Sequence, residues 1–139
     1  MKLLTFISTG IIVLISSCCA TKEMSKQITP LYETKWLLKK IDTGNGIEEV
    51  QTKAFIRFDK EKQSGGGNGS CNSFGSNATI NGNEISFKNI FSTKMYCEDV
   101  QQTEDAFLKQ LGKVNRFEVK DKTLSLYLDR EILLEFQSE

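Results

Sequence analysis

The sequence predicts an α+β domain in which a mostly antiparallel, barrel-like and partly closed sheet packs against one α-helix. Two observations support this fold class. From Leu31 onward, short runs of alternating apolar and polar residues are separated by turn-forming residues, as in antiparallel sheets. One stretch, Glu98 to Gly112, instead repeats its apolar residues at helical spacing. At 139 residues the chain has room for one such core.

Two strands and a loop are expected in the first half of the domain. The mostly apolar run 36–41 precedes the turn-forming residues 42–46, so it is expected to form the first strand. In the run 54–59, alternate residues are apolar, which predicts a strand with one buried face. The glycine-rich segment Ser64–Ser70 is expected to form a loop.

A β-hairpin is expected next. Thr79-Ile80 and the run 85–87 flank Asn81-Gly82-Asn83, and Asn-Gly between two apolar runs favours a tight hairpin turn because both residues tolerate positive φ. The following segment, Asn89 to Cys97, is expected to form a further strand.

The helix is expected to follow Glu98 and Asp99, whose negative charges favour a helix N-terminus, and to stop at Gly112. Four apolar residues share one of its faces: Val100, Phe107, Leu108 and Leu111. Three strands are expected after it: Val114–Val119, Thr123–Leu128 and Glu131–Phe136. The phenylalanines of the strands and helix are expected to lie in the core: Phe55, Phe58, Phe74, Phe87, Phe91, Phe107, Phe117 and Phe136.

Residues 1–17 are predicted to be a lipoprotein signal peptide. The apolar run that follows Lys2 has a length typical of a signal peptide, about 7 to 15 residues, and is too short for a transmembrane helix of about 20. Leu14-Ile15-Ser16-Ser17-Cys18 resembles the bacterial lipobox, so Cys18 is the predicted lipidation site. Residues 18–30 are then a lipidated tether, and residues 31–139 the folded domain.

This interpretation makes the membrane a partner of the protein through its lipid anchor. Several acyl chains on Cys18, each methylene contributing about 0.8 kcal/mol, would hold the protein stably at a bilayer. The expected location is the bacterial cell envelope. Because the residue after Cys18 is not Asp, the sequence resembles lipoproteins that are sent to the outer membrane.

Two stretches of the domain resemble the META domain family. Gly69-Ser70-Cys71-Asn72 is similar to the family's Gly-x-Cys-Asn segment, and Thr93-Lys94-Met95-Tyr96-Cys97 to its Thr-x-Met-x-Cys segment. Further matches are Trp36, Glu104 with Phe107, and Leu124-Ser125-Leu126. The chain departs from the pattern between Asn72 and Gly75, which are one residue closer than in the family. The resemblance implies a compact antiparallel β domain with one helix and no catalytic site, in a family that includes heat-inducible bacterial lipoproteins.

A disulfide between Cys71 and Cys97 fits this resemblance. The cell envelope allows disulfides, and a loop of this size would stabilise the fold by about 3 to 4 kcal/mol. Two reduced, buried thiols are the alternative, in a host without oxidising machinery. A redox-active pair is disfavoured because no Cys-x-x-Cys spacing is present. Cys19 would remain unpaired beside the anchor.

The composition argues against several function classes. Lys plus Arg and Asp plus Glu are equal, at 18 each, so no broad positive field favours nucleic acid. With no histidine, Ser-His-Asp and Cys-His nucleophiles and the common zinc sites are excluded. We therefore expect a protein that is not an enzyme and that carries neither a metal nor a cofactor other than its lipid.

Three functions are compatible with these observations. The first is an anchored lipoprotein that supports envelope integrity under stress or binds an envelope protein. The second is a carrier of a small apolar ligand, which requires unfilled volume between sheet and helix. The third is an enzyme inhibitor whose glycine-rich loop is exposed and rigid. The candidate binding residues of that loop are Asn68, Gly69, Asn72 and Phe74.

Overall fold

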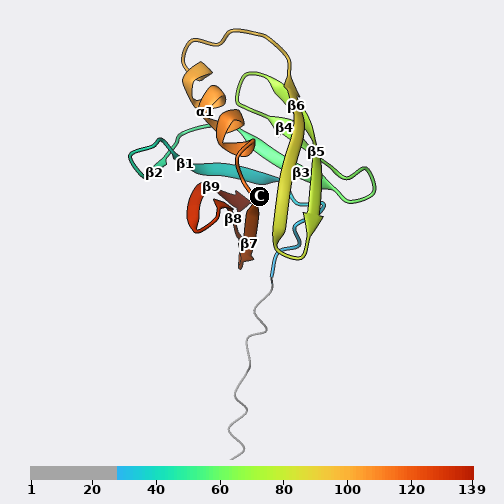
Figure 1. The fold of residues 1–139 in the computed structure, drawn as a ribbon. Helices are drawn as coiled ribbons and strands as arrows, with labels where there is room; N and C mark the ends of the chain where they lie inside the picture. Colours follow the sequence, from blue (N-terminus) through green and yellow to red (C-terminus); the bar gives the residue numbers. More distant parts are fainter. Residues whose placement is uncertain (1–27) are drawn as a thin grey trace, which may run out of the picture.

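The structure, a computed structural model, describes residues 28–139 (Figure 1). The predicted signal peptide, the lipidation site Cys18, Cys19 and most of the tether lie outside the described residues. Within residues 28–139 the chain forms nine strands and one helix. That helix is neither long nor apolar enough to cross a membrane.

All strand pairings are antiparallel. The elements are β1 (Trp36–Asp42), β2 (Ile47–Glu49), β3 (Phe55–Asp59), β4 (Ser64–Asn68), β5 (Ser73–Asn81), β6 (Glu84–Ser92), α1 (Gln101–Leu111), β7 (Arg116–Lys120), β8 (Thr123–Leu128) and β9 (Glu131–Ser138). The strands are ordered β2-β1-β3-β4-β5-β6-β7-β8-β9, and β1 also pairs with β9. The sheet therefore closes into a ring of hydrogen bonds.

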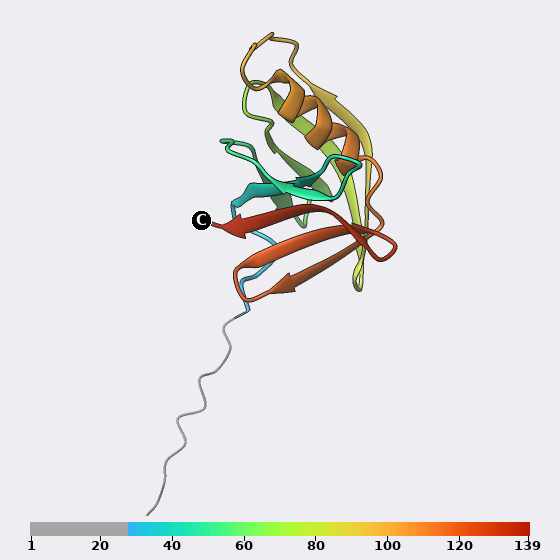
Figure 2. The same ribbon diagram turned by 90° about the vertical axis from the view of Figure 1, so that its left-hand side faces the viewer.

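This ring is uneven, because β6 and β7 share a single residue pair, Glu84 with Arg116. Helix α1, which connects these two strands, contacts β9 and β1 (Figures 1 and 2). The predicted α+β class, with a partly closed antiparallel sheet and one packed helix, is confirmed.

Aromatic side chains fill the space between the sheet and α1. Trp36, Phe107 and Phe136 are fully buried. The Phe107 ring from α1 packs edge-on against Phe74 and Phe136, with centroid distances of 5.3 and 6.0 Å. The volume that an apolar ligand would need between sheet and helix is therefore occupied by side chains.

The prediction of a loop at Ser64–Ser70 is wrong, because Ser64–Asn68 forms β4 and pairs with both β3 and β5. Its glycines mark close approaches rather than a turn. A Cβ added to Gly67 would overlap with the Phe55 backbone oxygen. Glycine inside a strand is typical of such crowding between backbones.

The hairpin at Asn81-Gly82-Asn83 is present, and Gly82 has a φ of 60°. The predicted strand at Asn89–Cys97 has wrong bounds, since β6 runs on from the hairpin to Ser92 and residues 93–97 form no strand. Strand β2 was not predicted, because its three residues are all exposed and show no apolar alternation.

A β-bulge interrupts β6. Residues 88 and 91 of β6 are opposite residues 77 and 75 of β5, so β6 has one extra residue there, and Asn89 has a φ of 53°. One extra residue moves every later side chain to the other face. Ile85 and Phe87 point into the core, whereas Phe91 lies outside and is 69% exposed. The prediction of Phe91 as a core residue is therefore wrong.

Candidate functional site

The two cysteine-containing stretches meet at one end of the molecule. Cys71, in the loop between β4 and β5, forms a disulfide with Cys97, in the connection between β6 and α1. The two Cα atoms are 6.0 Å apart, and 26 positions separate the residues in the sequence. The bridge ties the segment that leads into α1 to the β4–β5 loop.

Asn72 connects the same two segments through its side-chain amide. Its Oδ1 atom accepts hydrogen bonds from Thr93 Oγ1 at 2.7 Å and from the Met95 backbone nitrogen at 2.8 Å. Its Nδ2 atom donates to the Met95 backbone oxygen at 2.9 Å. One buried side chain thus satisfies both backbone groups of Met95 and fixes the position of that residue.

Glu104 of α1 holds Asn72 in turn. Its Oε2 atom accepts hydrogen bonds from the backbone nitrogens of Cys71 at 3.1 Å and Asn72 at 2.7 Å, and its Oε1 atom accepts one from Asn72 Nδ2 at 2.6 Å. Glu104 is 2% exposed and Asn72 3%. A buried carboxylate needs such donors, because an unsatisfied buried charge is strongly destabilising.

We call Gly69, Asn72, Thr93 and Glu104 the Asn72–Glu104 cluster. Gly69 belongs to it because an added Cβ would lie 2.5 Å from Glu104 Oε2. Both carboxylate oxygens of Glu104 accept hydrogen bonds from the chain itself and are shielded from solvent. The cluster therefore holds together α1, the β4–β5 loop and the connection that follows β6. Within residues 28–139, no group of three or more acidic or cysteine side chains is arranged to hold a metal ion.

The predicted binding loop does not have the expected exposure. Asn72 and Phe74 are buried, and Gly69 is packed against Glu104. Asn68 is half-buried, and its Oδ1 atom accepts a hydrogen bond from the Ser70 nitrogen at 2.8 Å. The prediction that residues 68–74 are exposed is wrong for Gly69, Asn72 and Phe74, which are buried, and Asn72 turns inward to bond with Glu104 of α1. An inhibitor that acts through this loop is not supported.

Three large apolar residues face solvent at this end, and they were not predicted as a binding surface. Phe91, Met95 and Tyr96 are 69%, 59% and 77% exposed. We call Phe91–Cys97 the contact segment. Figures 1 and 2 show the connection between β6 and α1 at the top of the molecule, whereas residues 28–35 enter at the opposite end. Phe91 reaches the surface because of the bulge in β6. The sequence alone did not predict that bulge.

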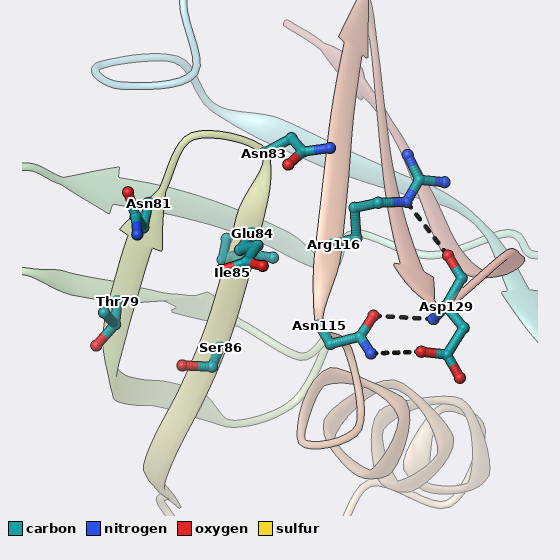
Figure 3. A pocket seen from close by; sticks show the side chains of 9 residues that line it. All are labelled: Thr79, Asn81, Asn83, Glu84, Ile85, Ser86, Asn115, Arg116 and Asp129. Carbon is teal, nitrogen blue, oxygen red and sulfur yellow. Dashed lines mark hydrogen bonds between the residues drawn. The ribbon is translucent and has the colours of Figure 1, made fainter.

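A separate groove of about 600 Å³ lies where β6 and β7 diverge (Figure 3). It is lined by Thr79, Asn81, Asn83, Glu84, Ile85, Ser86, Asn115, Arg116 and Asp129. Asn115 and Asp129 are joined by two reciprocal hydrogen bonds of 2.8 Å. This groove contains no predicted site residue, and all of its lining residues except Ile85 have polar side chains.

Arg116 is fixed on one wall of the groove. Its Nε atom donates to the Asp129 backbone oxygen at 3.2 Å, and its guanidinium carbon lies 3.8 Å from the centre of the Tyr127 ring. These contacts hold the β8–β9 turn against the start of β7.

Comparison with known proteins identifies relatives of the whole domain. The model of the META domain family matches residues 29–139. Among solved structures, an NMR structure of a protein from Burkholderia xenovorans has a TM-score of 0.63 and 19% identity, over 99% of this chain and 99% of that one. A second NMR structure has a TM-score of 0.58 and 18% identity, over 80% and 95% of the two chains. No curated protein matches. At these identities the solved structures show a shared fold.

Proposed function

This chain belongs to the META domain family, and we propose that it is a lipid-anchored envelope protein that binds an envelope protein partner. The proposal is supported by the lipobox-like sequence that ends at Cys18 and by the contact segment. In this proposal the protein is not an enzyme. It is attached to the outer membrane through Cys18, it contacts its partner through the segment Phe91–Cys97, and it supports envelope integrity under stress.

The observation that carries the proposal is that Met95 is both exposed and fixed. Single exposed apolar side chains are ordinary on a protein surface. Here three large ones, Phe91, Met95 and Tyr96, occur within seven residues. Aromatic residues and Met are enriched in protein interfaces, and a pre-organised surface loses little conformational entropy on binding.

The position of the contact segment fits a tethered protein. Residues 28–35 lie at the opposite end of the domain from the connection that carries Met95 and Tyr96 (Figures 1 and 2). With lipid on Cys18, a tether that enters at the lower end would direct the contact segment away from the membrane. A partner in the periplasm or in another envelope layer could then reach it.

In-cell photocrosslinking tests the proposal. A photoreactive phenylalanine analogue replaces Tyr96 in one strain and Asn83, in the hairpin turn towards the lower end, in the control strain. We expect one protein to be captured from position 96 and not from position 83. Capture of the same proteins from both positions, or of none from position 96, would contradict the proposed surface.

Membrane fractionation of wild type and Cys18→Ser tests the anchor. Wild type should be recovered with the outer membrane, and the variant should lose lipid labelling and leave that fraction. If Cys18→Ser still incorporates labelled palmitate, the anchor is elsewhere, and Cys19→Ser is the next variant to examine.

A further inference from the structure

We propose that the Asn72–Glu104 cluster, and not the disulfide, positions the exposed Met95, so that this part of the contact segment keeps its place when Cys71–Cys97 is reduced. The binding role of Met95 rests on the proposed function. The positioning itself depends only on the contacts described above.

The Asn72–Glu104 cluster and the disulfide hold different parts of the contact segment. Four hydrogen bonds fix residues 93–95 without any sulfur atom. Three are the bonds of Asn72 to Thr93 and to both backbone groups of Met95, at 2.7, 2.8 and 2.9 Å. The fourth runs from the Thr93 backbone nitrogen to the Ser73 oxygen at 3.0 Å. Because these bonds end at Met95, the segment up to that residue is fixed independently of the disulfide.

The disulfide fixes the next part of the chain. The Cys97 backbone oxygen accepts hydrogen bonds from the nitrogens of Val100 at 3.2 Å and Gln101 at 2.9 Å, which form the turn that leads into α1. With Cys97 held by Cys71, this turn is fixed to the β4–β5 loop. Reduction should therefore loosen residues 96–101 while Met95 stays in place.

Glu104 connects the cluster to α1 without the disulfide. It lies three residues beyond Gln101, in the first turn of α1, and accepts hydrogen bonds from both the backbone nitrogen and the side chain of Asn72. The path from α1 to Met95 therefore runs through Glu104 and Asn72 and bypasses Cys97. Once reduced, the Cys71 thiol would have an acceptor in place, since its sulfur lies 3.8 Å from the Met95 oxygen.

Reduction here is an ordinary exchange with a small dithiol such as dithiothreitol. The S–S bond breaks, each cysteine sulfur gains one electron and one proton, and the dithiol is oxidised to its cyclic disulfide. No other reactant is needed.

Amide hydrogen exchange of the full-length mature protein in detergent tests the inference. After reduction, exchange of the Val100 and Gln101 amides should rise at least about tenfold, while that of Met95 should change by less than about threefold. With the disulfide intact, Glu104→Gln should raise Met95 exchange at least about tenfold, because Asn72 loses an acceptor. Glu131→Gln, at an exposed position, is the matched control and should change neither.

If Glu104→Gln does not fold, Thr93→Val replaces it, since Val retains the shape of Thr but cannot donate to Asn72 Oδ1. It should also raise Met95 exchange. Equal loosening of Met95 and Gln101 on reduction would overturn the inference. Crosslinking from position 96 reports separately on the proposed function, so a protected Met95 without a captured partner would leave the positioning intact and contradict only the binding role.

Discussion

Gly69 lies so close to Glu104 that a Cβ atom added to it would be 2.5 Å from the Oε2 atom and 2.7 Å from the Cγ atom. Because Glu104 is buried and bonded on both oxygens, it cannot move aside. Glycine is therefore required at this position for the loop to close over the carboxylate.

Replacement of this glycine should be costly. We expect Gly69→Ala to lower the free energy of unfolding by about 1 to 3 kcal/mol, measured by urea denaturation. The control is Gly112→Ala, where the nearest atom to an added Cβ is Ile90 Cδ1 at 3.6 Å and φ is −70°. That change should be neutral or slightly stabilising, by up to about 1 kcal/mol. Equal effects of the two substitutions would show that crowding at Glu104 is unimportant.

Removal of the buried carboxylate should be more costly still. Glu104→Ala leaves the donors of Cys71 and Asn72 without their acceptor in a buried site. We expect a loss of about 2 to 4 kcal/mol in the free energy of unfolding. Asp105→Ala, at the exposed neighbouring position, should change it by only about 0.5 kcal/mol. Thermal unfolding followed by circular dichroism gives the comparison.

The disulfide should stabilise the fold without being needed to reach it. A bridge between residues 26 positions apart contributes about 3.5 kcal/mol in the chain-entropy model. We expect Cys71→Ser with Cys97→Ser to lose about that amount and to give a folded protein whose stability no longer responds to reductant. A double variant as stable as wild type would argue against a bridge in the cell.

The loss of an aromatic ring should have different effects in the core and on the surface. Phe107→Ala should cost about 3 to 5 kcal/mol, because Phe107 fills the space between Phe74 and Phe136. Phe91→Ala should cost less than about 1 kcal/mol, since the ring lies outside over Gly75. In the crosslinking experiment, however, Phe91→Ala should reduce partner capture. Unchanged capture would remove Phe91 from the proposed interface.

Asp59 offers a test by pH. Its pKa is lowered first by a hydrogen bond from the Lys62 backbone nitrogen, at 2.9 Å, and then by the Lys62 charge. A lowered pKa in the folded state stabilises the protein above the pKa of the unfolded chain, and the benefit is lost as pH falls below about 4. Lys62→Ala keeps the backbone donor, so most of the shift should remain in a carboxyl-carbon NMR titration. Return to an ordinary pKa would assign the shift to charge.

Local sequence patterns predicted several elements of the fold. The runs at β1, β3, β8 and β9, the Asn-Gly turn and the helix each carry a local pattern that tertiary contacts reinforce. Strand β4 carries no such pattern, because Gly65, Gly66 and Gly67 have no side chains to alternate. Only the neighbouring strands reveal why glycine is needed there.

The sequence predicted which residues belong to the Asn72–Glu104 cluster but not how they are arranged. The sequence resemblance singled out Gly69, Asn72, Thr93 and Glu104 but could not show that they meet around one buried carboxylate, since Asn and Glu are more often exposed. The contact segment was hidden for a different reason. The bulge at Asn89 reverses the face of Phe91, and such a register change depends on the partner strand.

The pairing of β1 with β9 has a consequence for how the chain folds. Trp36 lies opposite Ser138, so the first long strand acquires one of its neighbours only when the last residues of the domain arrive. Contacts between such distant positions slow folding, because the chain loses the entropy of loop closure before the strand pairing stabilises it. A chain whose last strand has not yet been added would present one edge of β1 unpaired, and loss of the final strand would expose that edge to association with other chains.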